Sequence, residues 1–389
     1  MTRRAAIIVL DGLGIGPAHD TDRYHDEGSD TLGNVARAVG GLSLPNLEAV
    51  GLGRCADLQG IAPVAIPRAG FGVCEPASPG KDSTTGHWEI CGLLLAQPFP
   101  TYPGGFPPAI IQQFARRTGR GVLGNRPSSG TAILDEFGAE HCRTGKWIVY
   151  TSADSVFQVA AHASIVPLQE LYSACTAARQ ILRGEHAVSR VIARPFDGEP
   201  GRWRRTPDRR DFSLPPPGST LLDRLAEHGV PRVGVGKVDD LFAGRGISSE
   251  HTATNREAYA LIQNALETMA RGLLLANVIE FDQTWGHRND VAGFRAGLEE
   301  LDQALPDLLR PVRDQDLVIF TADHGNDPTT ASTDHSREAV PLLVYGPRVQ
   351  PVDLGRRRTF ADIGQTVAEF LQVPPLAAGS SFLSEVWRD

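Results

Sequence analysis

The sequence predicts an α/β fold with a mostly parallel sheet between helices and a smaller α/β domain inserted into it. Short apolar runs alternate with amphipathic helices, which is typical of a parallel sheet covered on both faces. Two stretches rich in proline and glycine, residues 97–108 and 213–218, interrupt this alternation and suit linkers. We therefore expect a core formed by residues 1–98 and 218–389, with residues 99–217 as the inserted domain.

Residues 5–10 form the first expected strand, because an unbroken run of Ala, Ile, Val and Leu favours a strand buried on both faces. The later strands are expected at residues 146–150, 188–193, 230–235, 274–281, 317–320 and 341–345. Helices are expected where apolar residues recur with helical spacing, most clearly over residues 291–309. The other expected helices are residues 31–39, 45–50, 87–93, 168–183, 219–228, 255–270 and 360–371.

Composition excludes several classes of protein. The formal net charge is −8 and no long run of one sign occurs, which argues against a nucleic-acid-coating protein. The five cysteines are an odd number with no CxxC spacing, a pattern of reduced thiols in the cytoplasm. The apolar run near the N-terminus is too short for a cleaved signal peptide, and no run reaches the roughly 18–20 apolar residues that span a bilayer.

The most informative segment follows the expected strand at residues 317–320. Asp323 and His324 come directly after it, where open α/β sheets place their ligand sites, and His335 returns on the same loop. Carboxylate and imidazole together suit a divalent cation such as Mn²⁺ or Zn²⁺. Asp11 and Asp282 also follow expected strands, with His287 shortly after the latter.

Each of these features has an ordinary structural explanation when it is taken alone. An aspartate that ends a strand is often a helix cap, and the hydroxyls of Ser83, Thr84 and Thr85 suit the cap of the helix at residues 87–93. Their joint occurrence favours a shared site. Two neighbouring cations can stabilise the attacking and leaving oxygens of a phosphoryl displacement, and a hydroxyl beside them can act as the nucleophile.

Five segments together resemble the phosphopentomutases, which belong to the alkaline-phosphatase-like metalloenzymes. The matching segments are residues 11–16 (DGLGIG), 81–89 (KDSTTGHWE), 280–287 (EFDQTWGH), 321–328 (TADHGNDP) and 333–335 (TDH). The resemblance implies an alkaline-phosphatase-like core with an inserted cap, and two Mn²⁺ ions. It implies Asp11, Asp323, His324 and the nucleophile hydroxyl as ligands of one ion, and Asp282, His287 and His335 as ligands of the other.

The resemblance also assigns the nucleophile to Ser83, where the family usually has threonine. Serine keeps the hydroxyl, but its freer rotamer could admit water and raise hydrolysis. Thr84 and Thr85 are the alternative nucleophiles. The sugar and distal phosphate contacts implied by the resemblance are Ser152, Asp154, Val156, Arg190, Arg205 and Lys237.

The implied activity is interconversion of ribose 1-phosphate and ribose 5-phosphate, or of the 2-deoxy sugars, through a phosphoserine primed by a sugar bisphosphate. The cap would exclude water from that phosphoserine. We expect a cytoplasmic monomer of nucleoside salvage that acts on a small sugar phosphate and contacts neither nucleic acid nor membrane. A phosphohydrolase with the same nucleophile and metals, and a sugar-phosphate binding protein without activity, are the alternatives.

Overall fold

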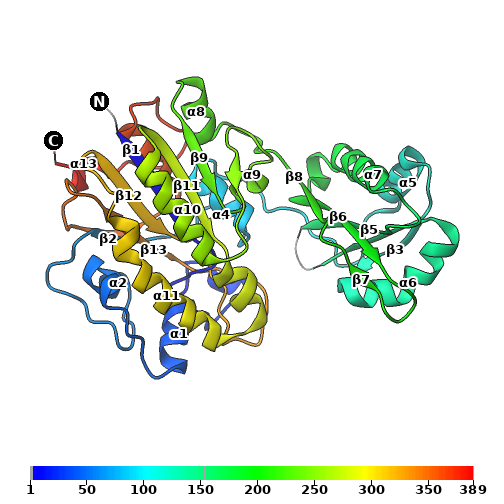
Figure 1. Ribbon diagram of the computed structural model, residues 1–389, viewed down its shortest axis with the longest axis horizontal. Helices are drawn as coiled ribbons and strands as arrows, with labels where there is room; N and C mark the ends of the chain where they lie inside the picture. Colours follow the sequence, from blue (N-terminus) through cyan, green and yellow to red (C-terminus); the bar gives the residue numbers. More distant parts are fainter. Residues whose placement is uncertain (1–2, 153–154, 389) are drawn as a thin grey trace. The chain divides into compact units, whose positions relative to one another are not determined.

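The computed structural model describes residues 3–152 and 155–388, which form two compact units (Figure 1). One unit comprises Met1–Gln97 and Pro216–Asp389, and the other comprises Pro98–Pro215. These limits lie within two residues of the boundaries expected from the proline-rich stretches. The assignment of a catalytic role to the first unit and of a cap role to the second stays a prediction.

The first unit is built on a sheet with strand order β10-β9-β11-β1-β12-β13-β2-β14. Its central strand β1 runs parallel to both β11 and β12, whereas β13 is antiparallel to both of its neighbours. The sheet is therefore mostly parallel, as expected. The strands are β1 (Arg4–Leu10), β2 (Gly70–Cys74), β9 (Arg232–Val235), β10 (Ser249–Glu250), β11 (Gly272–Val278), β12 (Asp316–Thr321), β13 (Val340–Tyr345) and β14 (Asp353–Arg357).

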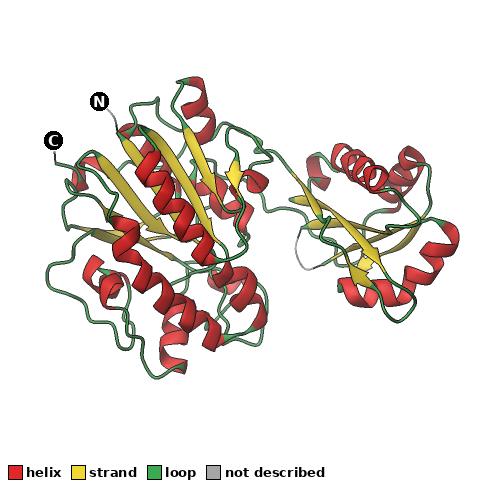
Figure 2. Ribbon diagram, viewed as in Figure 1, coloured by secondary structure: helices red, strands yellow, loops and turns green. Residues whose placement is uncertain are grey.

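Helices cover this sheet on both faces. Every residue of β1, β11 and β12 is buried, which requires cover on each side. Helices α10 and α11 lie over the face turned toward the viewer in Figure 2. The helices of this unit are α1 (Thr31–Ala38), α2 (Pro45–Val50), α3 (Leu52–Cys55), α4 (Ser83–Ile90), α8 (Leu221–Glu227), α9 (Val238–Leu241), α10 (Asn255–Thr268), α11 (Val291–Leu309), α12 (Ala361–Phe370) and α13 (Leu383–Val386), with a 3-10 turn at Thr21–Tyr24.

Several expected elements were wrong in their bounds, and two of them lie beside the predicted site. Helix α4 begins at Ser83 and not at residue 87, because the Asp82 side chain caps it by accepting a hydrogen bond from Thr85 N at 3.1 Å. Strand β11 ends at Val278, and a π-helical turn at Phe281–Trp285 follows where the strand was expected to continue. Such turns are frequent at functional sites.

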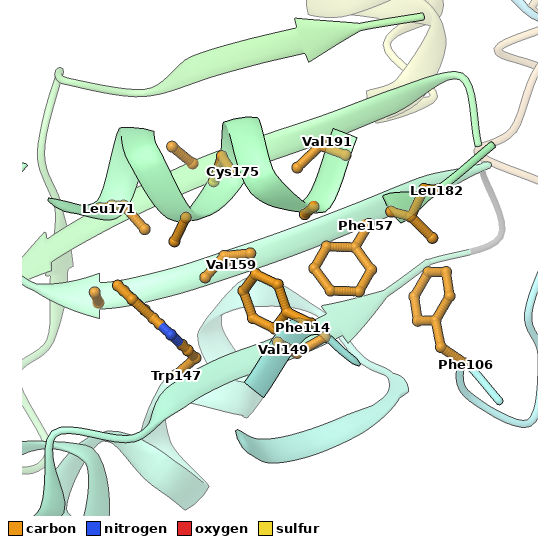
Figure 3. Packing of buried hydrophobic residues seen from close by; sticks show 14 of the residues in the cluster. Phe106, Phe114, Trp147, Val149, Phe157, Val159, Leu171, Cys175, Leu182 and Val191 are labelled. Carbon is orange, nitrogen blue, oxygen red and sulfur yellow. The ribbon is translucent and has the colours of Figure 1, made fainter. Parts of the chain in front are cut away.

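The second unit has a sheet of its own with strand order β3-β4-β5-β6-β7, and β8 pairs with β6. Figure 3 shows the apolar cluster on one face of it, where Phe106, Phe114, Trp147 and Phe157 pack together. This unit therefore has its own hydrophobic core. Its elements are β3 (Val122–Pro127), β4 (Trp147–Thr151), β5 (Val156–His162), β6 (Arg190–Asp197), β7 (Arg204–Arg205), β8 (Arg210–Ser213), α5 (Pro108–Thr118), α6 (Gly130–Thr144), α7 (Leu168–Ile181) and a 3-10 turn at Gly184–His186.

The thiols are free, as expected, and three of them are buried, namely Cys74, Cys91 and Cys175. Burial raises the pKa of the Cys55 thiol to about 12, so this half-buried side chain stays protonated. Among the described residues, no helix is both long enough and apolar enough to cross a bilayer.

A buried arginine joins the first residues of the adjacent strands β1 and β12. Arg4 is 1% exposed, and its guanidinium donates to both carboxylate oxygens of Asp316. The same group donates to the carbonyls of Leu266, Met269 and Pro311. A planar guanidinium can satisfy this many acceptors at once, which a lysine ammonium cannot.

We predict that Arg4→Met lowers the free energy of unfolding by about 3–5 kcal/mol, because it leaves the buried Asp316 carboxylate without its ion-pair partner. Urea titration followed by circular dichroism measures the change. Arg295→Met, which removes an exposed ion pair with Glu299, is the control and should cost less than about 1 kcal/mol. Equal losses in the two variants would contradict the importance of burial.

Candidate metal centre

The predicted ligands converge at the carboxyl ends of β1, β11 and β12. Asp11 follows the last residue of β1, Asp282 lies in the π-helical turn after β11, and Asp323 follows β12. His335 precedes β13, on a segment whose neighbour Ser336 exchanges backbone hydrogen bonds with Gly325. Adjacent parallel strands end at the same edge of the sheet, so their loops bring together residues that are far apart in sequence.

Ser83 lies in this cluster at the first turn of α4. Its hydroxyl oxygen is 3.3 Å from Asp11 Oδ1, to which it donates, and 3.1 Å from His324 Nε2. The residue is 8% exposed, so the hydroxyl is nearly enclosed. The amino-terminal turn of a helix presents backbone N–H groups and a partial positive charge, which favour a phosphate group at this position.

One group of ligand atoms consists of Asp282, His287 and His335, which lie within 4.8 Å of one another. Asp282 Oδ1 is 3.1 Å from His335 Nε2 and 3.5 Å from His287 Nε2. His287 Nδ1 donates to the carbonyl of Thr333 at 2.7 Å, which leaves the lone pair of Nε2 directed at the shared centre. These are the three residues that the sequence grouped around one ion.

A second group consists of Asp11, Asp282 and His324, also within 4.8 Å. It differs from the predicted set, which had Asp323 in place of Asp282. In the structure, Asp323 Oδ1 accepts a hydrogen bond from Gly12 N at 3.1 Å. Asp282 therefore belongs to both groups, and the two candidate centres share a carboxylate.

Asp323 lies at the margin of the second group. Its Oδ2 is buried, accepts no hydrogen bond from the described residues, and lies 3.5 Å from His324 Nε2. The same oxygen is 3.1 Å from His87 Nδ1, which donates to the carbonyl of Ser83 at 2.9 Å. A buried carboxylate oxygen without a donor is costly, and a cation beside it would offset that cost.

The charged groups in this cluster shift one another's pKa values strongly. Burial raises the pKa of Asp11, but Lys237 and His324 outweigh it, so the net pKa lies well below its usual range. Burial also raises the pKa of Asp282, and His335, His287 and Lys237 reverse that effect. Both carboxylates are therefore ionised at neutral pH.

The pKa of His324 shifts in the opposite direction, upward. Burial lowers the pKa of its imidazole, but the carboxylates of Asp323, Asp11 and Asp282 raise it to about 10. Metal binding to Nε2 must then displace a proton. The donor set fits divalent cations, because several buried, ionised oxygens and imidazole nitrogens converge there and Nδ1 of His324 lies 3.0 Å from the carbonyl of Gly325.

Lys237 was predicted to contact the distal phosphate of the substrate. The structure places it in the first unit, with its ammonium group 2.6 Å from Asp11 Oδ2. Burial lowers the pKa of Lys237, but the nearby carboxylates of Asp11 and Asp282 outweigh it, and the pKa is raised. Lys237 thus adds positive charge beside Asp11, and a contact with substrate phosphate stays a prediction.

The remaining predicted contacts belong to the second unit. Ser152 is half-buried directly after β4, Val156 is the buried first residue of β5, and Asp154 lies outside the described residues. Arg190 Nη1 is 3.4 Å from Asp211 Oδ2. Arg205 is exposed on β7, with its guanidinium close to the backbone of Gly130. Their role in binding substrate stays a prediction.

Several residues that support the site were not singled out from the sequence. Asn326 Nδ2 donates to Asp282 Oδ1 at 2.7 Å and so orients the shared carboxylate. Asn277 is fully buried on β11, and its amide lies 3.3 Å from His87 Nε2. A buried asparagine inside an otherwise apolar strand is a signal that could have identified the second of these.

Comparison with known proteins agrees with this geometry. Residues 223–375 match the metalloenzyme superfamily, a range that contains the ligands from Asp282 to His335. A solved structure of Leishmania mexicana phosphoglycerate mutase, at low cobalt concentration, is similar in fold, with a TM-score of 0.50, 15% identity, and coverage of 100% of this chain and 98% of that one. The fold is therefore alkaline-phosphatase-like, and the family match marks a metalloenzyme whose two ligand groups could hold divalent metal ions.

Sequence relatives narrow this class further. The chain is 54% identical to the phosphopentomutase of Dictyoglomus turgidum over 386 residues, covering 99% of this chain and 98% of the relative. It is 56% identical to the phosphopentomutase of Anaeromyxobacter sp. strain K over 390 residues, covering all of both chains. The chain belongs to the phosphopentomutase family, and it is a mutase of the isomerase class.

We predict that Asp282→Ala removes both metal ions, because Asp282 contributes an oxygen to both groups, whereas His287→Ala removes about one. Metal content per chain is measured by inductively coupled plasma mass spectrometry after dialysis against Mn²⁺. Asp302→Ala is the control, since this buried carboxylate accepts hydrogen bonds from Asn46 N and Leu47 N and touches neither group. Equal losses in Asp282→Ala and His287→Ala would contradict the shared ligand.

Proposed function

We propose that the protein interconverts ribose 1-phosphate and ribose 5-phosphate, or their 2-deoxy forms, with Ser83 as the phosphate carrier and a pentose bisphosphate as primer. The observation that carries the proposal is the position of the Ser83 hydroxyl, within 3.3 Å of both Asp11 and His324 at the start of α4. A hydroxyl held by candidate metal ligands at a helix N-terminus is arranged to accept and return a phosphoryl group.

The reaction needs two transfers. Phosphoserine 83 passes its phosphoryl group to the free hydroxyl of a pentose monophosphate, which loses its proton while the Ser83 oxygen regains one. The bisphosphate then turns and returns its other phosphoryl group to Ser83, which leaves the isomeric monophosphate. The net change is a shift of phosphate between the two ends of the sugar.

The side chains around Ser83 have separate tasks in these transfers. Asp11 stays ionised and accepts the hydrogen bond of the Ser83 hydroxyl, which directs the oxygen at the incoming phosphorus. Lys237 offsets part of the negative charge that gathers when phosphate enters. Two divalent ions would be held by Asp11, Ser83, Asp282, His287, Asp323, His324 and His335. Mn²⁺ suits these oxygen and nitrogen donors. When bound, these ions stabilise the attacking and leaving oxygens.

A phosphohydrolase activity at the same site is the second candidate. It is favoured by serine at position 83, because a side chain without the second branch at Cβ has more rotamers and leaves room for water. We further propose a cytoplasmic role in nucleoside salvage or catabolism, in keeping with five free thiols.

Incubating the Mn²⁺-loaded protein with ribose 5-phosphate and a trace of bisphosphate separates these candidates. Formation of ribose 1-phosphate supports the mutase, and release of inorganic phosphate supports the hydrolase. If neither product forms, both candidates are overturned.

We predict that Ser83→Ala forms no phosphoenzyme and has no mutase activity, since the nucleophilic oxygen is lost. Intact-protein mass spectrometry after incubation with bisphosphate detects the phosphoryl group. Thr84→Val is the control: it removes the adjacent buried hydroxyl and should still be phosphorylated. A phosphorylated Ser83→Ala protein would move the nucleophile to Thr84 or Thr85.

We predict that Ser83→Thr lowers the ratio of phosphate release to isomerisation, because the added methyl group restricts the rotamer and fills space next to the oxygen. The ratio is measured from both products in the same reaction. An unchanged ratio would show that serine does not promote hydrolysis here.

A further inference from the structure

Arg337 is a buried arginine that the proposed mechanism does not use. It is 2% exposed and lies between His335 and β13. Every N–H group of its guanidinium has an acceptor. Nε and Nη2 donate to the two carboxylate oxygens of Asp20, Nη1 donates to the carbonyls of Ser78 and Gly80, and Nη2 also donates to the carbonyl of Pro76, at distances of 2.5–3.2 Å.

The three carbonyls belong to the segment that leads into α4, which we call the nucleophile loop (residues 76–82). Ser78 is fully buried, and the loop ends at Asp82, the cap of α4, directly before Ser83. Carbonyls of alternate residues therefore point at a single guanidinium, so the backbone of this loop curves around the charge. Arg337 thus holds the carbonyls of this loop, while the Glu89 carboxylate accepts from its Ala77 N and Ser78 N groups at 2.8 and 2.6 Å.

A second layer of contacts holds the same loop. Asp26 Oδ2 accepts from the backbone N–H of Arg337 at 2.8 Å, and Asp26 Oδ1 lies 2.8 Å from the ammonium of Lys81. The hydroxyl of Tyr24 accepts from Gly80 N at 3.1 Å, and the Arg337 guanidinium stacks over the Tyr24 ring at 4.8 Å from its centroid. The nucleophile loop and the His335 segment are thus joined by charge-assisted hydrogen bonds.

We propose that Arg337 is a positioning residue, which holds Ser83 in line with the substrate hydroxyl and so favours transfer to sugar over transfer to water. The inference rests on the proposed role of Ser83 as phosphate carrier. Small displacements of a reacting group are costly, since a shift of about 1 Å can lower a rate by about 100-fold. A loosened nucleophile loop would slow transfer to a fixed sugar hydroxyl, whereas mobile water would still reach the phosphoserine.

Arg4 provides a matched control inside the same unit. Its guanidinium also binds one carboxylate through two nitrogens and three backbone carbonyls, and it is equally buried. It lies where β1 begins, whereas the candidate site lies where β1 ends. Arg4→Lys and Arg337→Lys therefore make the same chemical change, since each keeps the charge and loses the planar fork of donors.

The test uses purified phosphoenzyme of each variant, mixed with saturating ribose 5-phosphate in a single turnover. The measured quantity is the fraction of phosphate that reaches the sugar as bisphosphate and the fraction that is released. We expect Arg337→Lys to slow transfer to sugar about 10- to 100-fold and to increase the released fraction, with metal content unchanged. Arg4→Lys should leave this partition as in the wild type, although it too is less stable. A merely structural role for Arg337 would lower stability without changing the partition.

A folded Arg337→Lys protein with wild-type transfer rate and partition would overturn the inference. If Arg337→Lys does not fold, Asp20→Asn provides the test. This variant removes the negative charge that pairs with the guanidinium, while every carbonyl contact can remain. An unchanged partition in that variant would also overturn it. A Ser83→Ala protein that still becomes phosphorylated would instead overturn the assignment of Ser83 as nucleophile. The measured partition would then have to be explained by another hydroxyl.

Discussion

The structure depends on gathering buried negative charge at one edge of a parallel sheet. Asp11 and Asp282 are almost fully enclosed and repel each other, so neighbouring positive charge is needed to keep both of them ionised. Lys237, His324 and His335 supply part of that positive charge from three other segments. Divalent ions would supply more, and metal binding is thereby linked to the arrangement of the loops that follow β1, β11 and β12.

Much of the core could be predicted from sequence because its strands are strongly apolar. The bounds of α2 and α11 were predicted correctly, and β1 was missed by one residue. Strand β2 was not predicted, since its two glycines weaken the pattern, and neither was β14, whose polar sequence is typical of an edge strand. Helix α5 was hidden by prolines that suggested a linker, although proline is well suited to a first helical turn.

The identity of the site residues was more accessible than their grouping. Acidic and imidazole side chains after apolar runs mark the candidate ligands, but the side-chain directions that make Asp282 common to both groups arise from a π-helical turn without a recognised sequence pattern. Among the supporting residues, Asn326 lies within the 321–328 motif and Arg337 lies two residues after the 333–335 motif. Their partners, Asp282 and the nucleophile loop, are nevertheless at least 40 residues away in the chain. Only the folded topology brings these groups together.

The division of the core by an inserted unit has a consequence for the order of folding during synthesis. Strand β1 pairs in register with β11 and β12, so that Arg4 is opposite Gly272 and Asp316, and neither partner exists while the first half is being made. The inserted unit has its own sheet and apolar core, and it is complete before either partner of β1 leaves the ribosome. The apolar β1 segment therefore lacks both of its strand partners until residues 272–278 have been made.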